Sequence, residues 1–134
     1  MPTAPILVVD RDPWVRRLLS VLLTSNNYSV LETDDGSEAL GLIASNRPGL
    51  LIVDVAISGM EAAAFLTNVV ERGYKGPIVV LSASTEAGAI AERFGATHME
   101  KPFDPKDLLD AVTRLFPTTS NRIVRPVFVS FVFR

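Results

Sequence analysis

The sequence predicts an α/β protein in which one parallel sheet lies between two layers of helices. Short apolar runs rich in Val and Ile alternate along the chain with segments of helical periodicity. The runs lack polar alternation, which is typical of strands buried on both faces of a parallel sheet. With right-handed crossovers, this βα alternation gives a doubly wound sandwich, and the 134 residues suit one domain of this kind.

Five strands are expected. Three are strong apolar runs, at Ile6–Val9, Leu50–Val53 and Ile78–Leu81. Two weaker candidates are Tyr28–Leu31 and the stretch around Thr97–Glu100. All five are short enough for strands and are separated by segments that fit helices.

The first and last predicted helices share the same start signal. Asp12-Pro13 and Asp104-Pro105 each place an Asp at the N-cap and a Pro at the first helical position. The inward stripes are expected to be Val15, Leu18, Leu19 and Leu22 in the first helix, and Leu108, Leu109, Val112 and Leu115 in Pro105–Leu115.

Three further helices are expected between them. They cover about Ser37–Ala44, Glu61–Arg72 and Thr85–Arg93. The first of the three turns Ala39, Leu40 and Ile43 inward, and the other two end before Gly73 and Gly95. A glycine just after a helix is a common stop signal.

Composition excludes several classes of function. The net charge of −2 does not suggest a nucleic-acid binder, and the absence of Cys excludes disulfides, thiolate zinc sites and a Cys nucleophile. The single histidine, His98, makes a His-rich metal site improbable on composition. No apolar run approaches the roughly 20 residues of a spanning helix, and residues 1–5 do not resemble a signal peptide. We expect a cytoplasmic protein that binds neither membrane nor nucleic acid directly.

Polar residues follow four of the five predicted strands. They are Asp10, Asp54, Ser82 and Lys101. Ligands of doubly wound sheets bind outside the carboxyl ends of the strands, so these side chains are expected to converge at one edge. A carboxylate can accept a phosphoryl group if a hard cation neutralises the oxygens, and lysine binds phosphate as a point charge.

The motifs that carry these residues resemble the receiver domain of bacterial two-component response regulators, the domain type of the chemotaxis regulators. They are Ile6–Asp10, Leu51–Val55, Val80–Ala83 and Lys101–Phe103, and the resemblance covers about residues 5–116. It implies a flavodoxin-like (βα)5 fold with strand order 2-1-3-4-5. It also implies a signalling domain, not an enzyme beyond self-catalysed phosphotransfer and dephosphorylation.

The resemblance assigns roles to individual residues. Asp54 would accept a phosphoryl group from a histidine kinase or phosphotransfer protein, with Lys101 contacting that group. Ser82 would be the switch hydroxyl, and the Lys101–Pro102 peptide bond would be cis. His98 falls where the family places a switch aromatic, although a half-buried ring that only packs is the plainer interpretation.

The resemblance implies Mg²⁺ bound by Asp10, Asp54 and the backbone carbonyl of Ala56. Arg11 stands where the family has a second acid. Asp12 could supply a ligand, but capping the first helix is its expected role. Arg11 could point inward and weaken Mg²⁺ binding, extend into solvent so that only one ligand is lost, or pair with Asp54.

The loop after Asp54 also departs from the family pattern. Ser58 replaces a Pro and Ala62 replaces a Gly, and from these changes we expect a looser loop and a shifted helix start.

Residues 117–134 follow the expected receiver domain at 1–116 as an apolar and basic tail. They hold three arginines, no acid, and three of the seven phenylalanines. Exposed, such a β-prone segment would promote aggregation. Three interpretations of this tail stay open: a strand folded over its own domain, an artefact, or an arm that pairs with a second protomer or with the sheet edge of a partner. We predict a homodimer in which one tail packs on the other protomer.

Two functions remain open from the sequence. The first is a single-domain regulator phosphorylated on Asp54, which signals by protein contact or relays the phosphoryl group. The alternative is a pseudo-receiver that acts as a dimerisation or docking module without phosphate, which Arg11 favours. An α/β enzyme or FMN protein is disfavoured, because Asp10–Pro13 lacks the Ser, Thr and Gly residues of a phosphate-binding loop.

Overall fold

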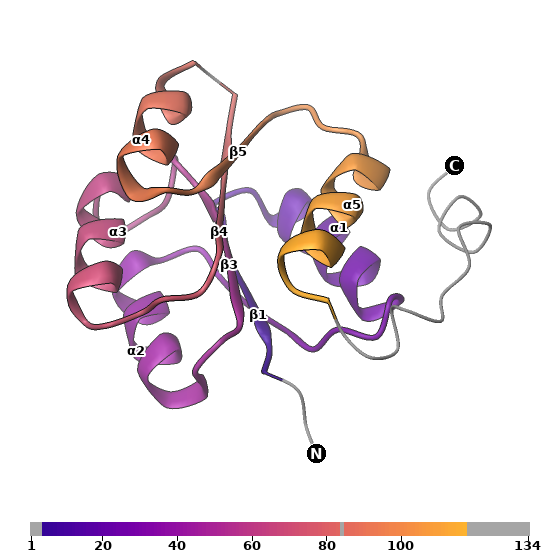
Figure 1. Ribbon diagram of the computed structural model, residues 1–134, viewed down its shortest axis with the longest axis horizontal. Coiled ribbons are helices and arrows are strands. Elements are labelled where there is room, and N and C mark those ends of the chain that lie inside the picture. Colours follow the sequence, from indigo (N-terminus) through magenta and orange to yellow (C-terminus); the bar gives the residue numbers. More distant parts are fainter. Residues whose placement is uncertain (1–3, 84, 118–134) are drawn as a thin grey trace.

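A computed structural model describes residues 4–83 and 85–117, which form a five-stranded parallel sheet of order β2-β1-β3-β4-β5. Figure 1 shows helices on both faces of this sheet. The predicted fold and strand order are confirmed. The elements are β1 (Ile6–Val9), α1 (Pro13–Thr24), β2 (Val30–Thr33), α2 (Gly36–Asn46), β3 (Leu50–Asp54), α3 (Ala62–Glu71), β4 (Ile78–Ser82), α4 (Glu86–Phe94), β5 (Thr97–Glu100) and α5 (Pro105–Leu115).

Two apolar clusters hold the layers together. Successive strand residues point to opposite faces, so Leu7 and Val9 of β1 join the cluster under α2, α3 and α4. Ile6 and Val8 join the cluster under α1 and α5. All four side chains are fully buried, which explains why the strand reads as a continuous apolar run.

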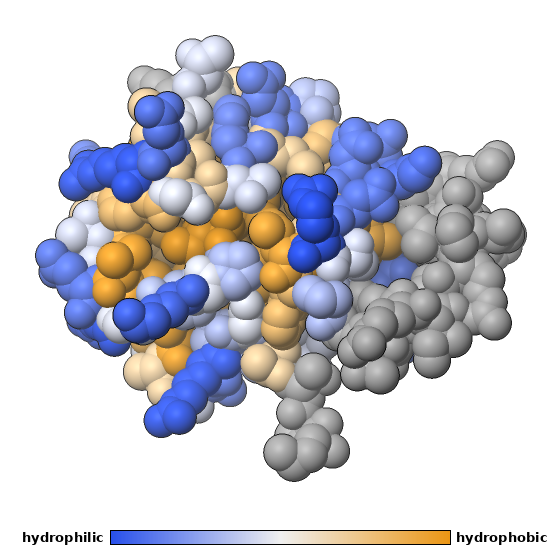
Figure 2. Space-filling view, in the orientation of Figure 1, coloured by the Kyte–Doolittle hydropathy of each residue, from blue (hydrophilic) through white to orange (hydrophobic). Residues whose placement is uncertain are grey.

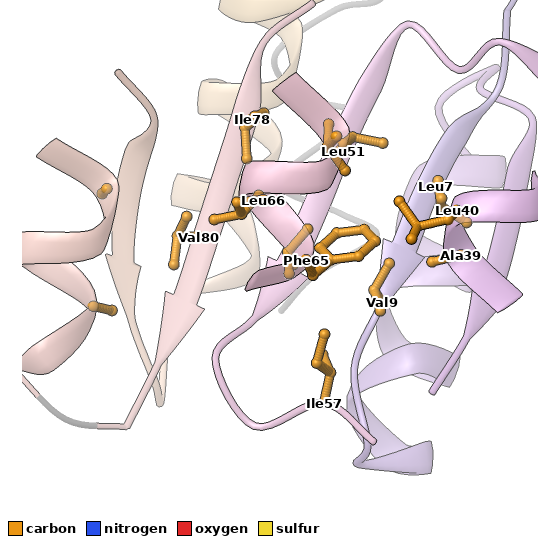
Figure 3. Packing of buried hydrophobic residues seen from close by; sticks show 14 residues of the cluster. Leu7, Val9, Ala39, Leu40, Leu51, Ile57, Phe65, Leu66, Ile78 and Val80 are labelled. Atoms are coloured by element: carbon orange, nitrogen blue, oxygen red, sulfur yellow. The ribbon is translucent and has the colours of Figure 1, made fainter. Parts of the chain in front are cut away.

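Phe65 of α3 is the largest fully buried side chain. Figure 3 shows its ring between α3 and β1, in the same cluster as Val9, Leu40 and Leu51. Burying a phenylalanine contributes roughly 1.5–3 kcal/mol. This packing fixes α3, and with it the loop that connects Asp54 to that helix.

The predicted caps of the first and last helices are confirmed. A carboxylate oxygen of Asp12 accepts a hydrogen bond of 2.9 Å from the backbone N–H of Trp14. Asp104 caps Lys106 at the same distance, and proline occupies the first turn of both helices.

The second strand was predicted two residues too early. β2 is Val30–Thr33, whereas Tyr28 lies outside the sheet with its ring 5.8 Å from that of Phe116. Its hydroxyl donates a 2.6 Å hydrogen bond to the Phe116 carbonyl, and a Cβ on Gly49 would collide with the Phe116 ring. Because β2 is an edge strand, it tolerates the exposed Glu32, which a search for apolar runs leaves out of the strand.

The inward face of α1 was partly wrong. Leu19, Leu22 and Leu23 are buried, but Leu18 is 39% exposed. Leu18 instead lies on an exposed side of the helix with Trp14 and Val21, which are 81% and 49% exposed, at helical spacing i, i+4 and i+7. We call these three residues the α1 outer stripe. Because α1 carries two apolar stripes, helical periodicity alone does not show which of them faces the core.

The limits of α2, α3 and α4 differ by one to two residues from the predicted ones, whereas α5 has the predicted limits. Among the described ranges, no helix is both long and apolar enough to span a bilayer.

Candidate functional site at the carboxyl edge of the sheet

The four strand-end residues meet at the carboxyl edge of the sheet. Asp10, Asp54 and Ser82 are 1%, 5% and 0% exposed, while Lys101 is half-buried. Together with Arg11, they line an open pocket of about 630 Å³. The convergence follows from topology, because parallel neighbouring strands end at the same edge.

Lys101 bridges the two carboxylates. Its Nζ lies 2.7 Å from Asp10 Oδ2 and 3.0 Å from Asp54 Oδ1. The remaining oxygens accept backbone hydrogen bonds, Asp10 Oδ1 from Asp12 at 2.9 Å and Asp54 Oδ2 from Ala56 at 2.8 Å. Two like charges are therefore held close together, with one ammonium group between them.

The backbone fixes Lys101 in this position. Its N–H donates a 2.7 Å hydrogen bond to the carbonyl of Ser82, which ties the end of β5 to the end of β4. The Lys101–Pro102 peptide bond is cis, as the resemblance implied.

Burial and pairing act against each other in this pocket. Burial raises the pKa of Asp10 above its ordinary value, and the hydrogen bonds from Lys101 and Asp12 only partly offset this. Burial alone would lower the pKa of Lys101, but its hydrogen bonds to Asp10 and Asp54 outweigh burial and raise the pKa. The lysine is therefore held in its charged form.

Arg11 extends into solvent at the mouth of the pocket. It is exposed, and within the described ranges it makes no ion pair, so the expected alternative of pairing with Asp54 is not observed. Sequence reasoning missed a second arginine near the site: Arg16 Nη1 donates a 2.6 Å hydrogen bond to the Asp10 carbonyl, and its Nε lies 3.4 Å from Glu32. Only the helical spacing of Arg16 from the Asp12 cap could have pointed to it.

The donor set left for a cation is small. Asp12 uses a carboxylate oxygen to cap α1, which is the role we expected for it. In the part of the chain that the structure describes, no three His, Cys, Asp or Glu residues form a metal-binding group. Mg²⁺ commonly uses one or two carboxylates and keeps several waters, so Asp10, Asp54 and the Ala56 carbonyl fit this ion.

Arg11→Asp is expected to strengthen Mg²⁺ binding about tenfold. The substitution adds a hard oxygen at the pocket mouth and removes a positive charge, although solvent screens an exposed guanidinium. Mg²⁺ titration followed by the fluorescence of Trp14, in the first turn of α1, measures the change.

Arg17→Asp is the matched control, because it makes the same charge change on an exposed residue of α1 that does not line the pocket. Equal affinities for Arg11→Asp and the parent protein would show that Arg11 has no electrostatic effect on the cation.

The loop after Asp54 is tied to its neighbour, contrary to the looser loop expected from Ser58. The Ser58 N–H donates a 2.8 Å hydrogen bond to Asp34, and its carbonyl accepts one of 2.9 Å from Gly36. A proline at this position could not donate the first of these. The helix α3 begins at Ala62, one residue after the Glu61 start expected from the sequence.

His98 is half-buried on β5, in register with Val80, and therefore faces the side covered by α4. Its Nδ1 lies 3.8 Å from the position that a Cβ on Gly88 of α4 would take. Its Nε2 is buried and has no hydrogen-bond partner among the described residues. The ring packs under α4, and its part in switching stays a prediction.

A parallel sheet of order β2-β1-β3-β4-β5, with two carboxylates, a hydroxyl and a lysine at its carboxyl edge, defines a signalling module of the receiver class. The sequence matches the response regulator receiver domain over residues 6–113, and the chain belongs to this family. Receiver domains are signalling modules that generally bind Mg²⁺ for phosphorylation and interact with histidine kinases or phosphotransfer proteins.

Particular relatives cover most of the chain. Sporulation initiation phosphotransferase F of Bacillus subtilis (strain 168) is 31% identical over 90% of this chain and 100% of its own length. Response regulator MprA of Mycobacterium sp. (strain KMS) is 36% identical over 86% of this chain but 51% of its own, so the chain spans about half of that relative. The structure of chemotaxis response regulator CheY4 of Vibrio cholerae aligns with a TM-score of 0.78, 29% identity, and coverage of 85% and 99% of the two chains.

Proposed function

We propose that this chain accepts a phosphoryl group on Asp54 from a histidine kinase or a phosphotransfer protein and signals by protein contact or by passing the group on. The observation that carries the proposal is the placement of Lys101 Nζ 3.0 Å from Asp54 Oδ1, in an open pocket that Ser82 also lines. The full-length match to a protein named as a phosphotransferase supports it. Arg11, which favoured a docking module without phosphate in the sequence, is exposed and leaves both carboxylates paired with Lys101, so it does not support that alternative.

In this proposal, an Asp54 oxygen attacks the phosphorus of the donor, and the bond from phosphorus to the leaving nitrogen breaks. The product is an acyl phosphate. Asp10, Asp54 and the Ala56 carbonyl would hold a Mg²⁺ ion, which would neutralise the negative charge of the phosphoryl oxygens. Lys101 would keep one contact to Asp10 and turn the rest of its hydrogen-bonding capacity to the phosphoryl group.

Ser82 and His98 are the residues that we propose to couple phosphorylation to the surface. Ser82 ends β4 beside the acceptor, and His98 lies on the adjacent β5 under α4. Phosphorylation would shift a pre-existing equilibrium between two arrangements of these strands and α4 and would build no new fold.

The α1 outer stripe is the surface that we propose for the phosphoryl donor. Trp14, Leu18 and Val21 are exposed apolar side chains on α1, which begins three residues after Asp10. A donor helix packed there would bring a phosphohistidine to the mouth of the pocket. Contiguous exposed apolar side chains commonly mark protein interfaces.

The test of phosphorylation is the intact mass after incubation with acetyl phosphate, with and without Mg²⁺. The proposal expects an Mg²⁺-dependent adduct of about 80 Da, the mass of one phosphoryl group in acyl-phosphate chemistry. No adduct at millimolar Mg²⁺ would contradict it.

Residues 118–134 lie outside the described residues, and the tail arm stays a prediction. We propose that residues 117–134 form an arm beyond a receiver domain at 1–116, and that the full chain is a homodimer through it. The support is the apolar sequence of residues 127–133, which is costly to leave in water. Light scattering on the full chain should give twice the monomer mass, and a chain ending at Phe116 should give the monomer. If both are monomers, the arm hypothesis fails.

A further inference from the structure

A second pocket lies at the opposite edge of the sheet from Asp54. It occupies about 430 Å³ between the carboxyl ends of α2 and α3 and the turns that lead into β3 and β4. Its apolar lining includes Leu40, Ile43, Val69 and Tyr74, and its charged lining residues are Arg47, Arg72 and Lys75. In Figure 2, the side of the molecule that carries α2 and α3 shows apolar surface bordered by hydrophilic side chains.

The charge around this pocket has one sign. Arg47, Arg72 and Lys75 are exposed, and no acidic residue lines the pocket with them. Within the described ranges, none of the three makes an ion pair. Three unpaired cations around an apolar floor complement an anion that has an apolar body.

Arg47 sits in backbone that arginine rarely adopts. As the C-cap of α2 it has φ 47° and ψ 64°, the left-handed conformation that favours glycine. At the end of α3, a glycine takes the left-handed position, as is common after a helix: Arg72 has φ −83° and Gly73 has φ 96°.

A cation that only complements the α2 dipole does not need left-handed backbone, and the position of Ala44 in the last turn would serve. An arginine kept in a strained cap at the rim of a pocket points instead to a use for its guanidinium group.

We propose that this pocket binds a small organic phosphate with a flat apolar body, of the nucleotide class. Guanidinium groups pair with phosphate oxygens in a bidentate manner, and the aliphatic and Tyr74 surfaces can receive a ring. The volume lies in the range of small-molecule sites.

Tyr74 adds no negative charge to the pocket. Its hydroxyl donates a 2.9 Å hydrogen bond to the Pro77 carbonyl, and burial raises its pKa well above the ordinary value. The group therefore stays neutral at physiological pH and does not repel an anion.

The site is separate from the phosphorylation pocket. Pro48 and Gly76, which line it, precede the first residues of β3 and β4, whereas Asp54 and Ser82 are the last residues of the same strands. A bound ligand would not compete with Mg²⁺ or a phosphoryl group.

Backbone amide NMR titrations of the full chain with AMP, inorganic phosphate and adenosine test the proposal. AMP should give saturable chemical-shift changes at residues 40–48 and 69–76. It should bind at least tenfold more tightly than phosphate or adenosine, because only AMP contacts both the cationic side chains and the apolar lining of the pocket. Absence of saturable AMP shifts there, or equal affinity for AMP and phosphate, would overturn the proposal.

Variants separate this site from general anion binding. Arg47→Gly relaxes the strained cap and removes one cation, so it should keep or raise stability while weakening AMP binding about fivefold. Arg72→Gln should weaken binding by a similar factor. Arg114→Gln, an exposed arginine on α5 outside the pocket, should leave the affinity unchanged. Equal losses in all three variants would reduce the effect to net charge and refute a specific site.

Discussion

Asp54→Asn is expected to abolish the phosphoryl adduct of about 80 Da, because an amide oxygen cannot form the acyl phosphate. The variant should remain folded. It removes one of two close carboxylates, and Lys101 keeps its 2.7 Å contact with Asp10. Intact mass spectrometry after acetyl phosphate treatment in millimolar Mg²⁺ measures the loss, and circular dichroism verifies the fold.

Two further variants sharpen this result. Asp110→Asn, on an exposed position of α5, should be phosphorylated like the parent protein. Asp10→Asn keeps the acceptor but loses a cation ligand, so it should react more slowly and still reach an adduct. An adduct on Asp54→Asn as abundant as on the parent protein would remove Asp54 from its role.

Lys101→Met is expected to lower the free energy of unfolding by about 2 kcal/mol in the absence of Mg²⁺. Removing one partner from a buried ion pair costs roughly 3–5 kcal/mol, and the open pocket reduces this because water reaches part of the site. The side chains left behind, those of Asp10 and Asp54, are only 1% and 6% exposed, and they would repel each other. Saturating Mg²⁺ should recover most of the loss, because the ion supplies the missing positive charge.

Urea unfolding with a chelator and with Mg²⁺ measures both quantities. Lys106→Met, on an exposed position of α5, is the control and should change stability by less than about 0.5 kcal/mol. If Lys101→Met is equally destabilised in both solutions, the loss comes from packing of the lysine stem and not from the carboxylate pair.

The meeting of the four strand-end residues at the carboxyl edge could be predicted, because it depends on the topology of the sheet alone. Buried parallel strands appear in the sequence as apolar runs, and the residue after each run must lie at the same edge. Asp10, Asp54, Ser82 and Lys101 therefore meet wherever the strand assignments are right. The Asp-Pro helix starts were predictable for a similar reason, since capping is local chemistry.

Features set by tertiary contacts could not be predicted in the same way. Leu18 and Leu19 are equally apolar in the sequence, and only the position of the sheet buries one and exposes the other. Tyr28 has strand propensity, but its contact with Phe116, 88 residues away, places it outside the sheet. The exposure of Arg11 and the bridging position of Lys101 depend on side-chain directions that spacing does not encode.

The contact of Phe116 with Tyr28 and Gly49 has a consequence for how such a domain can evolve. It anchors the last turn of α5 beside the first residues of β2 and β3, at the far end of the strands from Asp54. The chain therefore leaves the sheet at the end opposite the proposed phosphorylation site. Extensions after Pro117 can change in length and composition by mutation or recombination while the acidic pocket stays under separate selection. The MprA relatives, of which this chain spans about half, illustrate how much additional sequence a protein can join to a receiver domain.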